Sequence, residues 1–202
     1  KAMLLLFAAL LALFVSTAAM AAEAPFHIGI VTGTVSQSED DLRGAELMIK
    51  KYGDVAKGGM IQHLTYPDNF MSEMETTISQ IVGLADDPKM KVIVVDDAIP
   101  GTTEAFRRVK EKRKDILCFA GEAHEDPNVI TSVADMAINA DFVSRGYLII
   151  DTAKKLGCKT FVHISFPRHM SYETLGRRRA IMEQACKDLG IKFVFETAPD
   201  PT

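Results

Sequence analysis

The stretch "GIVTGTVSQSEDDLRGAE" (residues 29–46) concentrates glycine, hydroxyl and acidic side chains, which are the types that cradle phosphates or take part in catalysis. A Walker-type phosphate loop needs G-x-x-x-x-G-K-[ST], and a dinucleotide-binding loop needs G-x-G-x-x-G. After Gly33 the next lysine is Lys50 and the next glycine is Gly44, so both motifs are absent. The stretch is therefore not predicted to bind a phosphate.

Three carboxylates in this stretch, at residues 39–41, stand where an amphipathic helix pattern begins. Acidic side chains at a helix start complement its dipole but would repel an incoming phosphate. Ser38 and Asp41 have the spacing of a capping box. We expect these carboxylates to be solvated and to cap the helix.

Two other acidic clusters could hold a metal ion, and neither fits a known pattern well. Asp96 and Asp97 follow an apolar run as in phospho-acceptor receiver domains, but those domains also need an acidic pair after the first strand, where this chain has "TGT". The segment 121–128, "GEAHEDPN", could supply ligands for a hard cation, or it could be an ordinary solvated loop before a proline. We expect the solvated loop and no metal site.

Catalytic signatures are also missing from the sequence. It contains no G-x-S-x-G elbow and no H-E-x-x-H pair, and no nucleophile is accompanied by a base. We therefore predict no catalytic residues, no cofactor and no enzymatic activity.

The elements that position these residues alternate between apolar runs and amphipathic segments. Continuous apolarity over 92–95 predicts a buried central strand. Alternation at about 30 residues per unit predicts right-handed βαβ crossovers and a parallel sheet of an α/β protein. The expected strands are 26–33, 60–69, 91–100, 116–123, a weaker 129–141, 159–168 and 191–201, and the expected helices are 38–53, 71–88, 102–115, 143–157 and 171–190.

Ligands of open parallel sheets bind outside the carboxyl ends of the strands. The residues at those ends are mostly polar or acidic, and they include Asp68, Asn69 and Asp97 as binding candidates. Aromatic residues near the same ends could stack on a sugar ring or another planar solute, or pack singly in the core. These aromatic residues are Tyr66, Phe70, Phe142, Phe166 and Tyr172.

Composition and charge narrow the class of protein. The chain has 202 residues, of which 48% are hydrophobic and 25% charged, as in an ordinary globular protein. A net charge of -4 and the lack of a basic block argue against a nucleic-acid partner. Three cysteines without short metal-type spacing are expected to be buried, unpaired thiols: Cys118, Cys158 and Cys186.

The first residues have the pattern of a secretory signal peptide. A lysine is followed by an apolar run over 3–15 and by an A-x-A cleavage pattern at 19–21. The alternative is a membrane anchor over 2–22, which is just long enough to span. Residues 1–21 are predicted to be a signal peptide cut near Ala21, which places the mature protein in the periplasm or outside the cell.

The order of these pieces resembles a type I periplasmic binding protein of the ribose-binding kind. The resemblance rests on "FHIGIVTGTVSQSEDDLRGAELMIKKYG", "VIVVDDAIPGTTEAFRRVKEK" and the hinge-like "INADFVSRGYLIIDTAKKLG", which is followed by a strand and the helix "GRRRAIMEQACKDLG". Within that clan the chain is more similar to a bacterial family designated a domain of unknown function. The resemblance implies an N-terminal lobe over 22–142 and the start of an incomplete second lobe over 143–202, hence a fragment of a longer protein.

The resemblance also implies a set of ligand contacts. Sugar binders place an Asp-Arg pair after the fourth strand, whereas this chain has Glu122-Ala123, so a pentose or hexose is not implied. The contacts come from the loop after the first strand, from the end of the fourth strand, from the hinge, and from the loop and helix after the sixth strand. They correspond to Thr34, Ser36, Gln37, Glu122, Asp141, Phe166, Arg168 and Arg178.

The implied function is that of an exported receptor that closes on a small polar solute and delivers it to the permease of an ABC importer. Its membrane contact would come only through that partner. The alternative is a sensory module of the same fold that signals to a membrane partner. The identity of the solute, the choice between transporter and sensor, and the oligomeric state are not implied.

Overall fold

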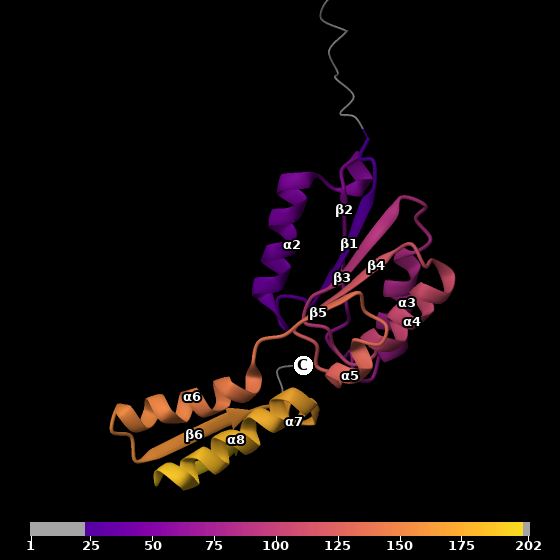
Figure 1. Cartoon of the computed structure of the whole chain (residues 1–202). Helices are drawn as coiled ribbons and strands as arrows, with labels where there is room; N and C mark the ends of the chain where they lie inside the picture. Colours follow the sequence, from indigo (N-terminus) through magenta and orange to yellow (C-terminus); the bar gives the residue numbers. More distant parts are fainter. Residues whose placement is uncertain (1–22, 200–202) are drawn as a thin grey trace, which may run out of the picture.

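The computed structural model describes residues 23–199, which form two parallel sheets. The first has five strands in the order β2-β1-β3-β4-β5, and the second pairs β6 with β7. Figure 1 shows the two sheets in separate parts of the molecule, joined by the chain that runs from β5 to α6. We call residues 27–138 the five-stranded unit and residues 142–197 the two-stranded unit.

The elements follow one another as the alternating pattern predicts, so the expected α/β fold with a parallel sheet is confirmed. The strands are β1 (His27–Thr32), β2 (Ile61–Thr65), β3 (Met90–Val95), β4 (Leu117–Gly121), β5 (Met136–Ile138), β6 (Thr160–Ser165) and β7 (Lys192–Thr197). The helices are α2 (Glu39–Tyr52), the 3-10 helix η1 (Val55–Lys57), α3 (Met74–Leu84), α4 (Thr102–Lys112), α5 (Pro127–Ile130), α6 (Phe142–Lys155), α7 (Pro167–Ser171) and α8 (Glu173–Leu189).

Helices cover both faces of the five-stranded sheet (Figure 1). On one face α2 packs its buried Ala45 with Ile30 of β1. On the other face α3 and α4 contribute Ile81 and Phe106 to the main core around Ile93. Strand residues alternate between the two faces, so an apolar run without polar interruptions is needed in a strand that is covered twice. This arrangement leaves the strand ends as the place where polar side chains collect.

The expected boundaries fail in two places. The weak apolar run over 129–141 forms the short helix α5 and the three-residue strand β5, so the single strand predicted there is wrong. The helix expected at 171–190 is preceded by a separate helix, α7, which begins at Pro167. Proline favours the first position of a helix because its φ is already helical, and the amide hydrogen that it lacks would have no intrahelical acceptor there.

In the two-stranded unit, α6 and α8 pack closely on one another around a small core that includes Ile150 and Met182. Gly146 allows this approach, since a Cβ atom at this position would lie 3.0 Å from the backbone oxygen of Arg178. On the strands, Val162 and Ile164 are exposed. The close helix contact fixes where Arg178 stands relative to α6.

The predicted signal peptide falls on residues outside the described part of the chain. Within residues 23–199, none of the helices is long and apolar enough to cross a membrane. All three cysteines are unpaired, as expected, but only Cys118 and Cys186 are buried. The prediction that Cys158 is buried is wrong because this residue lies in the exposed turn after α6.

Candidate functional site

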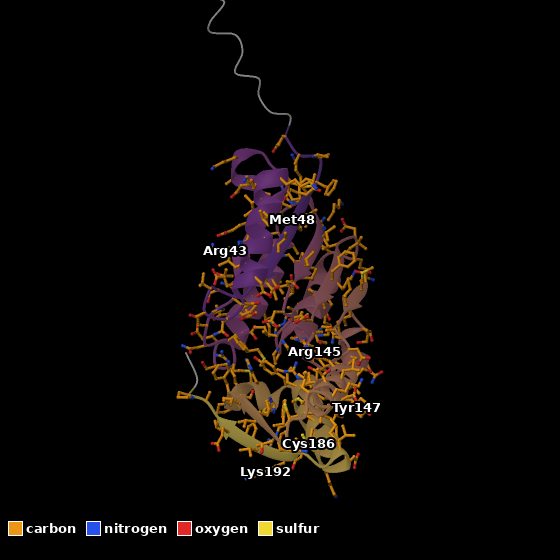
Figure 2. The ribbon with its side chains drawn as sticks, turned by 90° about the vertical axis from the view of Figure 1, so that its left-hand side faces the viewer. Arg43, Met48, Arg145, Tyr147, Cys186 and Lys192 are labelled. Carbon is orange, nitrogen blue, oxygen red and sulfur yellow. The ribbon has the colours of Figure 1, made fainter. Side chains whose placement is uncertain are left out.

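A polar cavity of about 450 Å³ lies where the two units meet. It opens at the carboxyl ends of β3 and β4 and is bounded by the start of α2 and by α6, α7 and α8. Figure 2 shows Arg145 of α6 at the level where the units meet. The lining residues are Gln37, Ser38, Asp40, Asp41, Phe70, Asp96, Asp97, Glu122, His124, Phe142, Arg145, His169, Tyr172, Leu175 and Arg178.

Asp97 is the centre of a buried hydrogen-bond network in this cavity. The Tyr66 hydroxyl donates to Oδ2 of Asp97 at 3.0 Å, and Nε2 of His124 lies 2.5 Å from Oδ1. Burial alone would raise the pKa of Asp97, but the hydrogen bonds and the charge of His124 outweigh it and lower the pKa below its usual 3.8. Burial and the charge of Asp97 in turn raise the pKa of Tyr66. Asp97 is thus an ionised anchor whose two donors are held in place.

Two of the cavity carboxylates sit on strained backbone. Asp97 has φ 53° and Glu122 has φ 43°, a left-handed backbone conformation that residues other than glycine rarely adopt. Backbone hydrogen bonds tie these loops together, since Ala98 donates to Gly121 at 2.8 Å and Glu122 donates to Ile138 at 2.7 Å. Such strain persists where the surroundings over-determine the conformation, and it is concentrated at functional sites.

Asp96 and Asp41 are two further carboxylates that line the cavity. Burial and the charge of Asp41 raise the pKa of Asp96. Burial also raises the pKa of Asp41, although its hydrogen bond with Ser38 opposes the shift. Gly121 leaves room for Asp96, because a Cβ atom there would lie 2.3 Å from Oδ1 of Asp96. Burial therefore disfavours the ionised form of both carboxylates.

The capping box predicted for Ser38 and Asp41 is wrong, whereas Glu39 and Asp40 are exposed in the first turn of α2 as expected. The Ser38 hydroxyl bonds the carboxylates of Asp40 and Asp41 and makes no hydrogen bond to the backbone of the helix. The carboxylates of Asp40 and Asp41 also line the cavity. The same sequence pattern fits a helix cap and a cavity wall. Only the packing of the two-stranded unit opposite these carboxylates distinguishes the two roles.

Arginines of the two-stranded unit form the opposite wall. The Arg178 guanidinium lies 5.4 Å from the ring centre of Phe142, and Gly146 brings α6 close beside it. Burial, and next the charge of Arg145, lower the pKa of Arg178. Among the described residues, the buried Nε atom of Arg178 has no hydrogen-bond partner. Arg145 is exposed at the mouth of the cavity.

Aromatic side chains join the two units beneath the cavity. The Tyr172 ring stacks on His124 with 4.5 Å between centroids and lies 6.4 Å from Phe70. Tyr172 and Phe70 belong to the same core cluster as Phe142, and all three also line the cavity. Tyr66 is fully buried and does not reach the lining. These rings are therefore chiefly core residues that build the floor of the site.

Four of the residues predicted from the sequence line the cavity: Gln37, Asp97, Glu122 and Arg178. Three others form a hydrogen-bonded group at its edge. The Thr34 hydroxyl bonds Ser36 at 2.9 Å and also donates to the Asp68 carboxylate, while Gln37 donates to the Asp68 backbone oxygen at 3.1 Å. Thr34, Ser36 and Asp68 thereby orient Gln37 without lining the cavity themselves.

The remaining four predicted residues lie outside the lining: Asn69, Asp141, Phe166 and Arg168. Asp141 caps α6 by accepting a hydrogen bond from the Ser144 amide at 2.9 Å, and this bond lowers its pKa. The Arg168 guanidinium lies 6.0 Å and 5.7 Å from the ring centres of Phe70 and Phe166. Asn69 is exposed in the loop before α3. The structure does not bring these four side chains into the cavity.

The segment 121–128 is not the solvated loop that the sequence suggested. His124 is buried against Asp97, and Glu125 accepts hydrogen bonds from the amides of Gly101 and Thr103 at 3.1 Å and 2.8 Å. Glu125 thus satisfies free amides at the start of α4. In the part of the chain that the structure describes, no group of three or more His, Cys, Asp or Glu residues is placed to hold a metal ion.

The fold is that of type I periplasmic binding proteins. A periplasmic solute-binding protein of an ABC transporter from Actinobacillus succinogenes 130z, solved with bound D-allose, matches with a TM-score of 0.61 and 16% identity over 85% of this chain and 59% of that one. A periplasmic ribose ABC transporter protein of Conexibacter woesei DSM 14684 matches with a TM-score of 0.57 and 15% identity over 90% of this chain and 57% of that one. A protein of Clostridium difficile 630, provisionally described as a transcriptional regulator, matches with a TM-score of 0.64 and 28% identity over 88% of this chain and 51% of that one.

The chain belongs to the family described as "Protein of unknown function (DUF3798)", whose pattern matches residues 26–202. An uncharacterized protein of Treponema pallidum (strain Nichols) is 45% identical over 178 residues, which are 87% of this chain and 80% of that protein. The chain spans between about half and 60% of the length of the solved structures it matches. The resemblance to type I periplasmic binding proteins, and to a family of unknown function among them, is confirmed.

Proposed function

We propose that this chain is the ligand-binding part of an exported receptor, which captures a small polar solute in the cavity between its two units and delivers it to an ABC importer. The observation that carries the proposal is the polar cavity of about 450 Å³ at the carboxyl ends of β3 and β4. Cavities of this size accept small solutes, and the ends of parallel strands are where open α/β sheets bind them. Residues from both units line it, so a bound solute would favour the closed arrangement.

The neighbours of known fold support the remaining parts of the proposal. Proteins named as periplasmic and as parts of ABC transporters share this fold, which supports a periplasmic location and a permease as partner. The signal-peptide pattern in residues 1–21 supports the same location. No chemical step on the solute is part of the proposal.

Thermal denaturation of the chain in the presence of candidate solutes tests the proposal. A solute at 100 times its Kd stabilises the folded protein by about 2.7 kcal/mol. For a protein of this size each kcal/mol shifts the melting temperature by roughly 2–4 °C, so a rise of about 5–10 °C is expected. A library of sugars, nucleosides, amino acids and organic acids that produces no shift at millimolar concentration would contradict the receptor function.

A second candidate function is a ligand-sensing module that passes closure to a membrane partner instead of a transporter. It is favoured by the similarity to the Clostridium difficile protein that is provisionally described as a regulator. Measuring uptake of the radiolabelled stabilising solute in cells with and without the gene distinguishes the transporter function from the sensor function. Unchanged uptake together with an altered transcriptional response would support the sensor, whereas lost uptake would support the transporter.

A further inference from the structure

The cavity carries opposite charges on its two walls. Asp41, Asp96 and Glu122 belong to the five-stranded unit, whereas Arg145 and Arg178 belong to the two-stranded unit. Within residues 23–199, none of these five side chains takes part in an ion pair, although exposed ion pairs are common elsewhere on the surface. Over this part of the chain the two walls therefore face each other without a direct ion pair between them, although the charge of Glu122 partly offsets the lowering of the pKa of Arg178.

Like charges within each wall repel one another. Asp96 is disfavoured as a carboxylate first by burial and then by Asp41 and its other acidic neighbours. Arg178 is disfavoured as a cation first by burial and then by Arg145. Such arrangements cost stability in the empty protein, and groups of opposite charge on a bound molecule would relieve them.

His124 provides a second observation that points to a ligand, a buried polar atom without a partner within residues 23–199. Its side chain is only 8% exposed and lines the cavity, and its Nε2 atom is held by Asp97. Its Nδ1 atom is buried and has no hydrogen-bond partner among the described residues. Buried polar atoms are nearly always paired, so an unpaired one beside a cavity indicates where a polar group of a solute or a water binds.

We infer that the cavity selects small zwitterionic solutes, of the amino-acid class, whose amino group faces Asp41 and Asp96 and whose carboxylate faces Arg178 and Arg145. This inference rests on the proposed function and names its solute class. A neutral sugar would form hydrogen bonds but leave both walls without a direct ionic partner. A purely anionic solute would be repelled by the carboxylates, and a purely cationic one by the guanidiniums.

A matched set of probes tests the inference on the full chain. The twenty L-amino acids form the zwitterionic arm, and D-ribose and D-allose form the neutral arm. Each amino acid that raises the melting temperature is then compared with its N-acetyl derivative, which keeps only the negative charge, and its amide, which keeps only the positive one. We expect both derivatives to bind at least about tenfold more weakly, since each loses a charge-assisted contact.

Paired variants assign the two ends of the solute. Arg178→Gln should weaken binding of the amino acid at least about tenfold but affect its amide much less, and Asp96→Asn should spare the N-acetyl derivative in the same way. Arg177→Gln is the matched control, because Arg177 is exposed on the same helix and pairs only loosely with Glu173 at 3.6 Å. Asp86→Asn, at an exposed ion pair with Lys112, serves the same purpose for the carboxylate.

The outcomes separate this inference from the receptor function beneath it. Binding of a neutral sugar without any amino acid would overturn the zwitterion inference and leave the receptor function standing. Equal binding of an amino acid and its two derivatives would also overturn it. Failure of every probe, in this set and in the wider solute library, would contradict the receptor function itself.

Discussion

Replacing Asp97 is expected to cost more stability than replacing any exposed carboxylate of this chain. Asp97 accepts hydrogen bonds from the Tyr66 hydroxyl and from Nε2 of His124, and both donors are buried. Asp97→Ala leaves both donors without an acceptor. Each unsatisfied buried donor costs about 1–3 kcal/mol, so the free energy of unfolding should fall by roughly 2–6 kcal/mol. Domains of this kind have only about 5–15 kcal/mol of total stability, which makes the loss large.

The strained backbone at this position must be separated from the lost hydrogen bonds. Asp97 has φ 53°, where alanine is less well tolerated than asparagine. Asp97→Asn keeps the backbone preference and one acceptor but removes the charge, so it should cost about 1–2 kcal/mol, less than Asp97→Ala. The difference between the two variants measures the acceptor together with the strain.

A double-mutant cycle with Tyr66→Phe isolates the hydrogen bond itself. Tyr66→Phe alone should cost about 1.5–3 kcal/mol, because it removes a bond to a charged group, whereas in the Asp97→Ala background it should cost little or even stabilise. Urea unfolding followed by circular dichroism gives the four free energies, with Asp86→Ala as the exposed control. Additive losses, or a loss below about 1 kcal/mol for Asp97→Ala, would refute the network as a stabilising element.

Three further predictions concern the walls of the cavity and its pH dependence. Gly146→Ala should lower stability by about 1–3 kcal/mol and weaken solute binding, because the added Cβ would press on the Arg178 backbone oxygen at 3.0 Å. Gly44→Ala is the control, since its Cβ would have nothing within 4 Å, and it should leave binding intact and stabilise α2 by about 0.5–1 kcal/mol. Calorimetric melting and titration of both variants measure these effects, and equal effects would contradict the prediction. Gly121→Ala should weaken solute binding by displacing the Asp96 carboxylate, which lies 2.3 Å from the added Cβ, and an unchanged affinity would count against Asp96 as a contact. The pKa of Asp97 is lowered in the folded protein, so its stabilisation is complete above its usual pKa of 3.8 and is lost as the pH falls through the lower folded value. The difference in unfolding free energy between the wild type and Asp97→Asn, measured by urea unfolding from pH 7 to pH 3, should be constant above about pH 5 and narrow below 3.8. A difference that widens in acid would contradict this prediction.

The sheet could be predicted from the sequence because the information that specifies it is local. Apolar runs such as 92–95, bounded by polar turns, can satisfy burial on both faces only as central strands. The short elements were harder, since α5, β5 and α7 span three to five residues each and carry too little periodicity to be recognised. Their conformation depends on Pro127 and Pro167 at helix starts and on pairing with β4.

The cavity was predictable only in outline because its second wall comes from residues distant in the sequence. Gln37, Asp97 and Glu122 follow strand ends, where the topology alone indicates a site. The sequence predicts a capping role for Asp41 and a solvated loop around His124, because nothing near them in the sequence reveals that Tyr172 and Arg178 pack opposite. Conversely, Asp141 has the sequence position of a hinge contact, but its carboxylate accepts a hydrogen bond from the Ser144 amide of α6.

A crystal structure of the chain with the most strongly stabilising amino acid tests the central claim most directly. The account predicts one solute molecule in the cavity between the two units, with its amino group at Asp41 and Asp96 and its carboxylate at Arg178. A solute bound elsewhere on the chain, with this cavity filled only by water, would contradict it.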